Sequence, residues 1–287
     1  MGNGSQNLLQ LTNANPRRSV GGYFQQRLPL PYAVPAGLQP QAFISTPHQF
    51  NDAIPANIDL LAGDAVLELQ TNAMATLANT QIPGTNTWLA VVDWLSDFIN
   101  ATGDTYQTMF IDANPSFSIY TQIALSAAER LVVPVMADDS SRRALQNGLA
   151  LVHGINLPAP IYAQHSFSQR LTGAGRQLPR IHIVVKNRLT QYMGPASAYH
   201  AILTSIDQLI ANAQNLHPHA FTFNAVANGV VDVRDFQTTG VVAFAEGVPF
   251  TRLCAGLHNI GGQQETQVNA QYITHCINAM QGLVALL

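Results

Sequence analysis

The sequence predicts an α/β fold, built as a three-layer, mostly parallel sheet with helices on both of its faces. Two observations lead to this prediction. Short apolar runs bounded by turn residues alternate with longer stretches of helical periodicity, which is the pattern of strands joined by crossover helices. The chain has 287 residues, of which 47% are hydrophobic, so it can bury a sizeable core. We expect one domain over residues 1–287.

Residues 1–56 differ from the rest because they are rich in proline and glutamine. The prolines of this part are Pro16, Pro29, Pro31, Pro35, Pro40, Pro47 and Pro55. A proline inside a helix removes a hydrogen bond and clashes with the preceding turn, so no long helix can run through this part. We expect it to be irregular, with short elements only.

The next elements are expected in the order of the chain. Residues 58–61 form a short strand candidate, and residues 65–77 consist of good helix formers. Residues 88–99 place apolar side chains at helical spacing. This spacing predicts one amphipathic helix that packs its apolar side on the sheet.

The strands of the sheet are expected where apolar runs end at turn residues. These runs are 108–111, 131–135, 181–185, 230–233 and 241–244. Helices are expected at 120–128, at 142–153 with Ser140 as the N-cap, at 199–210 and at 266–287. Strands that alternate in this way with helices predict a parallel sheet.

Charged residues are scarce, at 10% of the chain against about 25% in typical soluble domains. The basic residues are twelve arginines and one lysine, Lys186, which has no glycine nearby. The sequence therefore lacks the Gly-x-x-x-x-Gly-Lys-Ser/Thr loop that holds nucleotide phosphates. The net charge of −3 gives no electrostatic footprint for nucleic acid. Because no apolar run is long enough to cross a bilayer, we expect a cytoplasmic protein with no membrane partner.

Asp112 directly follows the strand candidate 108–111. In open α/β sheets ligands bind at the carboxyl ends of the strands, so this position is a candidate site. An aspartate there is typical of a Walker B element, in which the carboxylate holds the water shell of a Mg²⁺ ion that bridges nucleotide phosphates. The competing interpretation is that Asp112 caps the turn through residues 114–116.

Asn187 and Arg188 follow the strand candidate 181–185. The amide of Asn187 could pair with the edge of adenine, because it offers both a donor and an acceptor. The competing interpretation, which spacing alone favours, is a polar residue in a turn. Asp138 and Asp139 follow another strand and are expected to cap the helix after it rather than to act as acid and base. We assign no catalytic residue.

Several segments together resemble the ParA/MinD family of deviant Walker ATPases, which partition plasmids and chromosomes or position the division site. Residues 106–116 resemble the Walker B region of that family, with Asn114 in place of the first of its two prolines. Residues 57–64 resemble its Asn-Leu-Asp-Leu-Ile-Pro-Gly-Asp segment, and residues 131–135 resemble the strand after Walker B. Asn187 and Arg188 occupy the place of the adenine-reading pair, and residues 247–249 match a short loop near the purine.

The resemblance implies a P-loop NTPase-like fold that is incomplete at the N-terminus. Gly2 to Gln6 resemble the second half of a motif that follows the second strand of the family, so the P-loop and its lysine are absent. Either the chain is an N-terminally truncated ATPase, or it is a relative that has lost hydrolysis. We favour truncation, because loss of the central P-loop strand would leave neighbouring strands with unpaired backbone groups.

The resemblance also implies an activity and partners. The parent protein would hydrolyse ATP with Mg²⁺ as a homodimer, bind DNA without sequence preference and respond to a ParB-like partner protein. In this chain Asp112 would keep the metal contact, while Asn187, Arg188 and Pro249 would keep the nucleotide contacts. ATP binding and hydrolysis are expected to be impaired without the phosphate loop. The alternative function is a non-catalytic interaction module of the same fold. A dinucleotide-dependent enzyme ranks lower, because no complete glycine fingerprint is present.

Overall fold

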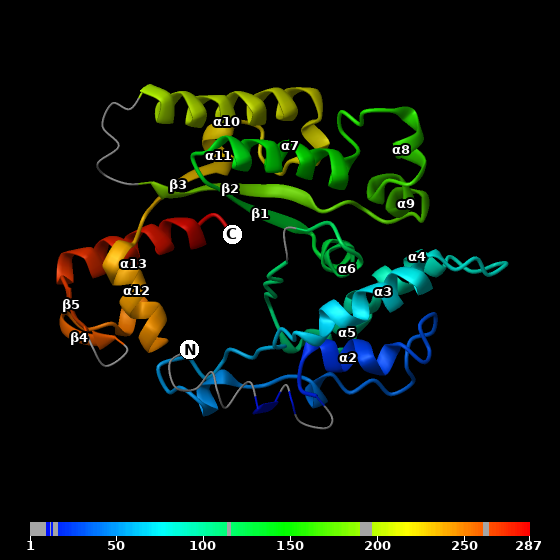
Figure 1. The fold of residues 1–287 in the computed structure, drawn as a ribbon, viewed down its shortest axis with the longest axis horizontal. Helices are drawn as coiled ribbons and strands as arrows, with labels where there is room; N and C mark the ends of the chain where they lie inside the picture. Colours follow the sequence, from blue (N-terminus) through cyan, green and yellow to red (C-terminus); the bar gives the residue numbers. More distant parts are fainter. Residues whose placement is uncertain (1–9, 12, 14–16, 114–115, 190–196, 261–263) are drawn as a thin grey trace. The chain divides into compact units, whose positions relative to one another are not determined.

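The computed structural model describes residues 10–11, 13, 17–113, 116–189, 197–260 and 264–287 (Figure 1). The chain divides into two compact units, Met1–Ala128 and Glu129–Leu287. The expectation of a single domain over residues 1–287 stays a prediction. The resemblance of Gly2 to Gln6 to a family motif concerns residues outside the described part of the chain.

The described residues of the first unit are mainly helical. Its α-helices are α2 (Val20–Arg27), α3 (Val66–Asn79), α4 (Thr87–Val92), α5 (Trp94–Ala101) and α6 (Ile119–Ala127). Short 3₁₀ helices are η1 (Pro40–Ala42), η2 (Pro47–Gln49) and η3 (Gly103–Thr105). The expected helix at 65–77 is confirmed as α3, and the expected helix at 120–128 is confirmed as α6. The expected strand at 58–61 is reduced to one bridge between Ser45 and Leu60.

The first unit is held by an aromatic core. Tyr23, Phe24, Trp94 and Phe98 are buried and contact one another through their rings. The Tyr23 hydroxyl donates to the carbonyl of Trp94 at 2.6 Å. Burial raises the pKa of Tyr23 to about 12, so this hydroxyl keeps its proton and remains a donor.

The expected helix at 88–99 is wrong in two respects. Asp93, with φ −83° and ψ 0°, ends α4 and begins α5, so the segment forms two helices instead of one. Within the first unit these helices pack on α3 and α6. The physical reason is that the described residues of this unit contain only isolated β-bridges, so another helix is the surface available to the apolar side chains.

The second unit has α/β architecture, which confirms the coarse fold prediction. Its elements are β1 (Arg130–Val135), α7 (Asp139–His153), α8 (Pro160–Gln164), α9 (Phe167–Gly173), β2 (Arg180–Leu189), α10 (Ser197–Leu216), η4 (Pro218–Ala220), α11 (Val226–Gly229), β3 (Val230–Arg234), α12 (Gln237–Glu246), η5 (Phe250–Arg252), β4 (Gly256–Ile260), β5 (Gln264–Val268) and α13 (Ala270–Val284). Strands β1, β2 and β3 form a parallel three-stranded sheet in that order. A separate antiparallel pair consists of β4 and β5.

Helices cover both faces of the parallel sheet (Figure 1). Side chains from α7 and α10 pack with Val184 and Ile181 on one face. On the other face Ile183 and Val185 pack near Leu283 of α13. The apolar run of β2 is thus buried on both sides, as expected for the central strand of a parallel sheet.

Local sequence explains where helix α7 starts and stops. Asp138, and not Ser140, is its N-cap, because the Asp138 carboxylate accepts the N–H of Ser141 at 2.6 Å. Gly154 ends the helix with φ 70°, a left-handed conformation that glycine adopts without steric cost. The capping role expected for this pair of acids is therefore confirmed for Asp138.

Two expected elements of the second unit are wrong. Residues 241–244, expected as a strand, lie inside helix α12. Val242 and Ala243 are buried while Val241 and Phe244 are exposed, which is a helical and not an alternating pattern. The expected helix at 266–287 begins later, as α13 at Ala270, because residues 264–268 pair with β4. Among the helices that the structure describes, none has the length and apolar character needed to span a bilayer.

Candidate functional site

The carboxyl end of β2 carries an irregularity beside a cavity. The register between β2 and β3 shifts between Lys186 and Leu189, so Asn187 and Arg188 form a bulge. Arg188 has φ 58°, which is uncommon for a residue with a side chain, and its N–H donates to the Asn187 side-chain oxygen at 2.9 Å. Bulges of this kind occur often beside active sites, where they redirect side chains. The Asn187 amide oxygen is thus already engaged in holding the turn.

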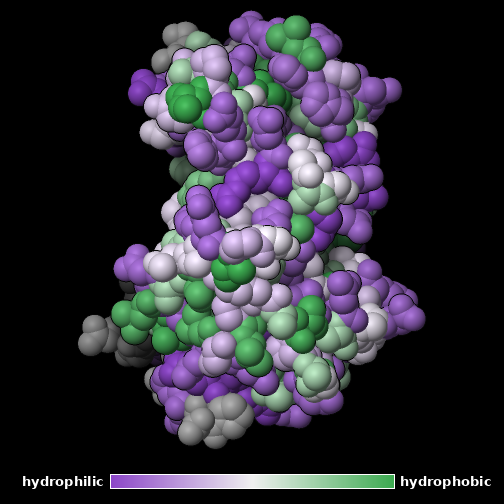
Figure 2. All heavy atoms as spheres, turned by 90° about the vertical axis from the view of Figure 1, so that its right-hand side faces the viewer, coloured by the Kyte–Doolittle hydropathy of each residue, from purple (hydrophilic) through white to green (hydrophobic). Residues whose placement is uncertain are grey.

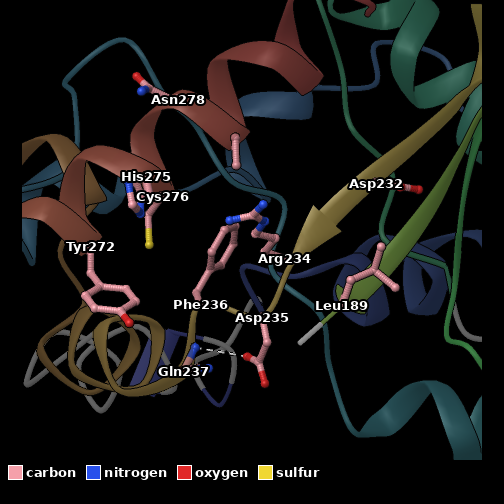
Figure 3. A pocket seen from close by; sticks show the side chains of 11 residues that line it. Leu189, Asp232, Arg234, Asp235, Phe236, Gln237, Tyr272, His275, Cys276 and Asn278 are labelled. Carbon is pink, nitrogen blue, oxygen red and sulfur yellow. Dashed lines mark hydrogen bonds between the residues drawn. The ribbon is translucent and has the colours of Figure 1, made fainter. Parts of the chain in front are cut away.

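The cavity lies where β2 and β3 end, against helix α13 (Figure 3). Its volume is about 250 Å³. It is lined by Leu189, Asp232, Arg234, Asp235, Phe236, Gln237, Tyr272, His275, Cys276, Asn278 and Ala279. Leu189 is tied to this wall because its carbonyl accepts the N–H of Asp235 at 3.1 Å. The volume is below the roughly 300 to 1,000 Å³ of pockets for drug-sized molecules, so it suits a nucleobase-sized group.

The turn after β3 forms one wall of the cavity, and α13 forms the opposite wall. Gln237 has φ 45°, and its N–H donates to the Asp235 carboxylate at 3.0 Å (Figure 3). Left-handed backbone at a residue other than glycine costs on the order of 1 to 3 kcal/mol and tends to cluster at functional sites. Tyr272, from the opposite wall, supplies an aromatic ring.

The side chains of the cavity are suited to binding. Carboxylates can accept from an exocyclic amine, whereas the guanidinium of Arg234 and the amides of Gln237 and Asn278 can donate. Aromatic rings can stack on a planar base. Burial raises the pKa of the Cys276 thiol, which keeps it in the weakly nucleophilic protonated form. This set favours recognition of a flat polar molecule over covalent chemistry.

The residues proposed for nucleotide contact are only partly brought together. Asn187 and Arg188 directly precede Leu189, which lines the cavity, but neither of them lines it. Pro249 follows α12 and is the N-cap of η5, and it does not line the cavity either. The nucleotide roles of these three residues stay predictions.

Lys186, the only lysine of the sequence, is engaged elsewhere. Its ammonium group contacts the Asp207 carboxylate of α10 at 2.6 Å, and its side chain is buried. A buried cation needs such a partner, because an unpaired charge in the interior is costly. Lys186 therefore connects β2 to α10.

The expected strand that leads to Asp112 is wrong. Residues 108–112 have no regular secondary structure, and the Phe110 side chain is 75% exposed. A strand needs neighbouring strands for its backbone hydrogen bonds, and no described strand pairs with this segment. Asp112 belongs to the first unit, whereas the nucleotide candidates belong to the second. Residues 114 and 115 of the same expected motif lie outside the described residues.

Magnesium and phosphate groups do not fit the described residues. Mg²⁺ requires an octahedral set of oxygen ligands, and Asp112 stands on an exposed segment without regular structure. Within the described part of the chain, no three His, Cys, Asp or Glu residues are grouped so as to hold a metal. The metal role of Asp112 stays a prediction.

Comparison with known proteins found no similar protein. No protein-family profile, curated protein or solved structure matches the chain. The resemblance to the ParA/MinD family therefore depends on the quoted segments alone.

Most of the cavity is not predicted by the sequence analysis above. Candidate residues were expected at the ends of three strands, at Asp112, at Asp138 with Asp139 and at Asn187, but none at the end of the strand at 230–233. The charged residues Asp232, Arg234 and Asp235 stand there, so the same strand-end rule could have found them. No local signal marks Tyr272 and His275, because they reach the cavity only through the packing of α13.

Proposed function

We propose that this chain is a ParA-like partition protein of P-loop NTPase-like fold, and that its second unit binds the base of an adenine nucleotide. The base would enter the cavity at the carboxyl ends of β2 and β3. The observation that carries this proposal is the position of the Asn187–Arg188 bulge directly beside a base-sized cavity at the end of a parallel strand. In open α/β sheets this is where ligands bind.

The side chains around the cavity support a base as the occupant. Tyr272 and Phe236 offer aromatic rings from two different walls, α13 and the turn after β3. Asp235 can accept the exocyclic amine of adenine, and Gln237 can donate to a ring nitrogen. Guanine carries a carbonyl where adenine carries that amine, so a carboxylate at this place would select against guanine.

The proposal covers the base and not the phosphates. The sequence has no glycine-rich loop with a lysine, and its one lysine is paired with Asp207. Backbone N–H groups at such a loop normally supply most of the phosphate recognition. ATP binding by this chain should therefore be weak, and hydrolysis impaired.

The partition role brings further proposals with it. As in the family that the segments resemble, the chain would form a homodimer, respond to a ParB-like partner and act on DNA in a cytoplasmic setting. DNA binding would belong to an ATP-bound dimer of a form that has the phosphate loop. The net charge of −3 gives this chain little electrostatic attraction to DNA on its own.

A second candidate function is a non-catalytic interaction module. It is favoured by large apolar side chains that remain exposed on the second unit, among them Phe244 and Val241 of α12. Exposed apolar residues that share one helix face are common at binding surfaces. In this alternative the cavity would bind no nucleotide, so a binding experiment separates the two functions.

The experiment that tests the proposal is ligand-detected NMR with adenosine and with guanosine. We expect adenosine to bind with millimolar to high micromolar affinity and guanosine to bind at least about tenfold more weakly, a difference of about 1.4 kcal/mol. Tyr272→Ala should abolish the adenosine signal. The matched control is Tyr162→Ala on α8, because Tyr162 is exposed and does not line the cavity.

Three results would count against the proposal. These are equal signals for adenosine and guanosine, an adenosine signal that survives Tyr272→Ala, and no signal for either nucleoside at millimolar concentration. The last result would favour the interaction module.

A further inference from the structure

His258 in strand β4 is placed between two hydrogen-bond acceptors. Its Nδ1 lies 2.5 Å from a carboxylate oxygen of Glu246, at the end of α12. Its Nε2 lies 2.9 Å from the backbone carbonyl of Cys254. A carbonyl oxygen only accepts hydrogen bonds, and so does an ionised carboxylate.

This arrangement requires two N–H donors on one ring. Neutral imidazole has one N–H and one bare nitrogen, whereas imidazolium has two N–H groups. In neutral His258, the ring nitrogen without a proton would therefore face an oxygen that can only accept, and their lone pairs would repel each other. Both contacts are satisfied together only when His258 carries its proton.

We infer that protonated His258 acts as a latch. Its two hydrogen bonds join the two ends of the segment between Glu246 and Cys254 and fix that segment to the β4–β5 hairpin. The segment runs from Gly247, which ends α12 with φ 67°, to Leu253, which is buried. Its two ends are the two partners of the ring, so one side chain bridges both ends. When His258 loses its proton, one bridge is lost and the segment gains freedom.

The other charged groups around the ring are consistent with this role. Helix α12 and strand β5 pack against β4, and Glu246 is the only titratable residue of α12. On β5 the residue opposite His258 is Thr266, which carries no charge. Glu265 lies opposite Asn259, so its side chain points to the other face of the hairpin. Arg252 of η5 is the nearest basic residue in the sequence.

The electrostatic effect acts in the same direction. The hydrogen bond to Glu246, and then the one to Cys254, raise the pKa of His258 above 6.5. The pKa of His258 is higher in the folded protein than in the unfolded protein. The two hydrogen bonds of His258 therefore contribute fully to the free energy of unfolding at a pH below the unfolded pKa. That contribution is lost as the pH rises through the folded pKa.

The latch would control a segment that includes Pro249, the residue matched to a purine loop. It does not depend on the proposed function, because the two bridges exist whether or not the cavity binds a base. Its test therefore uses no nucleotide and cannot fail merely because the proposed function is wrong.

The test is an NMR titration of the histidine side-chain nitrogens in the full chain. We expect the pKa of His258 to lie above 6.5, so that both ring nitrogens carry protons at pH 6. Glu246→Gln should move the His258 midpoint down, because it removes the charge that faces Nδ1. A His258 midpoint at or below 6.5, or one that Glu246→Gln does not move, overturns the inference.

Amide hydrogen exchange tests the mechanical part of the inference. At pH 6, His258→Phe should speed exchange of residues 247–253 about two- to fivefold, the range expected for an exposed ion pair. The matched control His200→Phe should leave this exchange unchanged. Equal exchange in the His258→Phe and wild-type proteins overturns the latch. If His258→Phe does not fold, the wild-type protein alone still tests the inference. Its exchange rates in residues 247–253, corrected for intrinsic rates, must rise over the same pH range in which His258 loses its proton.

Discussion

Segment 108–112 and strand β2 have similar sequences, because each is an apolar run that ends at a polar residue. In β2 the side chain of Val184 is 0% exposed, and the strand pairs with β1 on one side and β3 on the other. In segment 108–112 Phe110 is 75% exposed and Met109 is 38% exposed. The difference shows that an apolar run becomes a strand only where other strands satisfy its backbone. Four experiments test this difference between the two parts of the molecule.

The largest effect is expected from a charge placed in each of the two segments. Val184→Asp buries a carboxylate between the helices and the sheet, so it should destabilise the protein by more than about 4 kcal/mol. Phe110→Asp should change the free energy of unfolding by no more than about 0.5 kcal/mol, because the site is exposed. Urea unfolding followed by circular dichroism measures both. A loss of stability in Phe110→Asp comparable with that in Val184→Asp would show that segment 108–112 is buried after all.

The next effect concerns the buried end of β2. Lys186→Met removes the cation but keeps an apolar side chain, so it leaves Asp207 without its partner and should cost about 1 to 3 kcal/mol. The double variant Lys186→Met with Asp207→Asn should recover most of this loss. Thermal unfolding of the two variants provides the measurement. If Lys186→Met is as stable as the wild type, the ion pair does not hold β2 to α10.

The third effect is a pH dependence of stability that is expected for the second unit because of His153. His153 of α7 has both ring nitrogens buried without a hydrogen-bond partner, and burial lowers its pKa to about 4. Since the unfolded value is 6.5, the unfolded state binds the extra proton between these values. The contribution of neutral His153 to the free energy of unfolding of the second unit is therefore fully present above pH 6.5. It falls toward pH 4, by at most about 1.4 kcal/mol per pH unit.

His153→Phe should flatten this pH dependence, as measured by hydrogen exchange in the second unit. Both tryptophans, Trp88 and Trp94, lie in the first unit, so their fluorescence reports the other unit separately. If exchange corrected for its intrinsic rates gives the wild-type second unit the same stability at pH 4 and at pH 6.5, His153 is not buried in its neutral form.

The smallest effect is expected from one substitution at two places in β2. Arg188→Gly relieves the left-handed conformation at φ 58°, so it should be neutral or stabilise by up to about 1 kcal/mol. Arg180→Gly, at the first residue of the same strand, should destabilise by about 0.5 to 1 kcal/mol. Chemical denaturation compares the two. The same sign for both variants would argue against the bulge at Asn187 and Arg188.

The three strands of the parallel sheet could be predicted from the sequence because each is an apolar run bounded by turn residues, although only β2 is buried along most of its length. The error at residues 241–244 has a physical cause, since a run of four apolar residues is too short to separate a strand from a buried helix turn. Strands β4 and β5 were missed because residues such as Glu265 and Gln267 give no apolar alternation. The β4–β5 hairpin therefore depends on the pairing of its two strands and is not marked by an apolar pattern in either strand.

The candidate site was predictable in part. The strand-end rule led to Asn187, which lies at the bulge beside the cavity. It could not reveal that Arg188 adopts a left-handed conformation, because this depends on the register between β2 and β3. Tyr272 and His275 depend on where α13 packs, about 40 residues after β3 in the chain.

Whether the cavity binds a nucleotide through its base alone is decided by a titration of this chain with fluorescently labelled ATP and AMP, each with and without Mg²⁺. If the chain binds the base but not the phosphates, ATP and AMP should bind with affinities within about threefold of each other. Mg²⁺ should change neither affinity. Tight ATP binding that depends on Mg²⁺ and exceeds AMP binding by about a hundredfold or more, roughly 2.7 kcal/mol, would contradict the account.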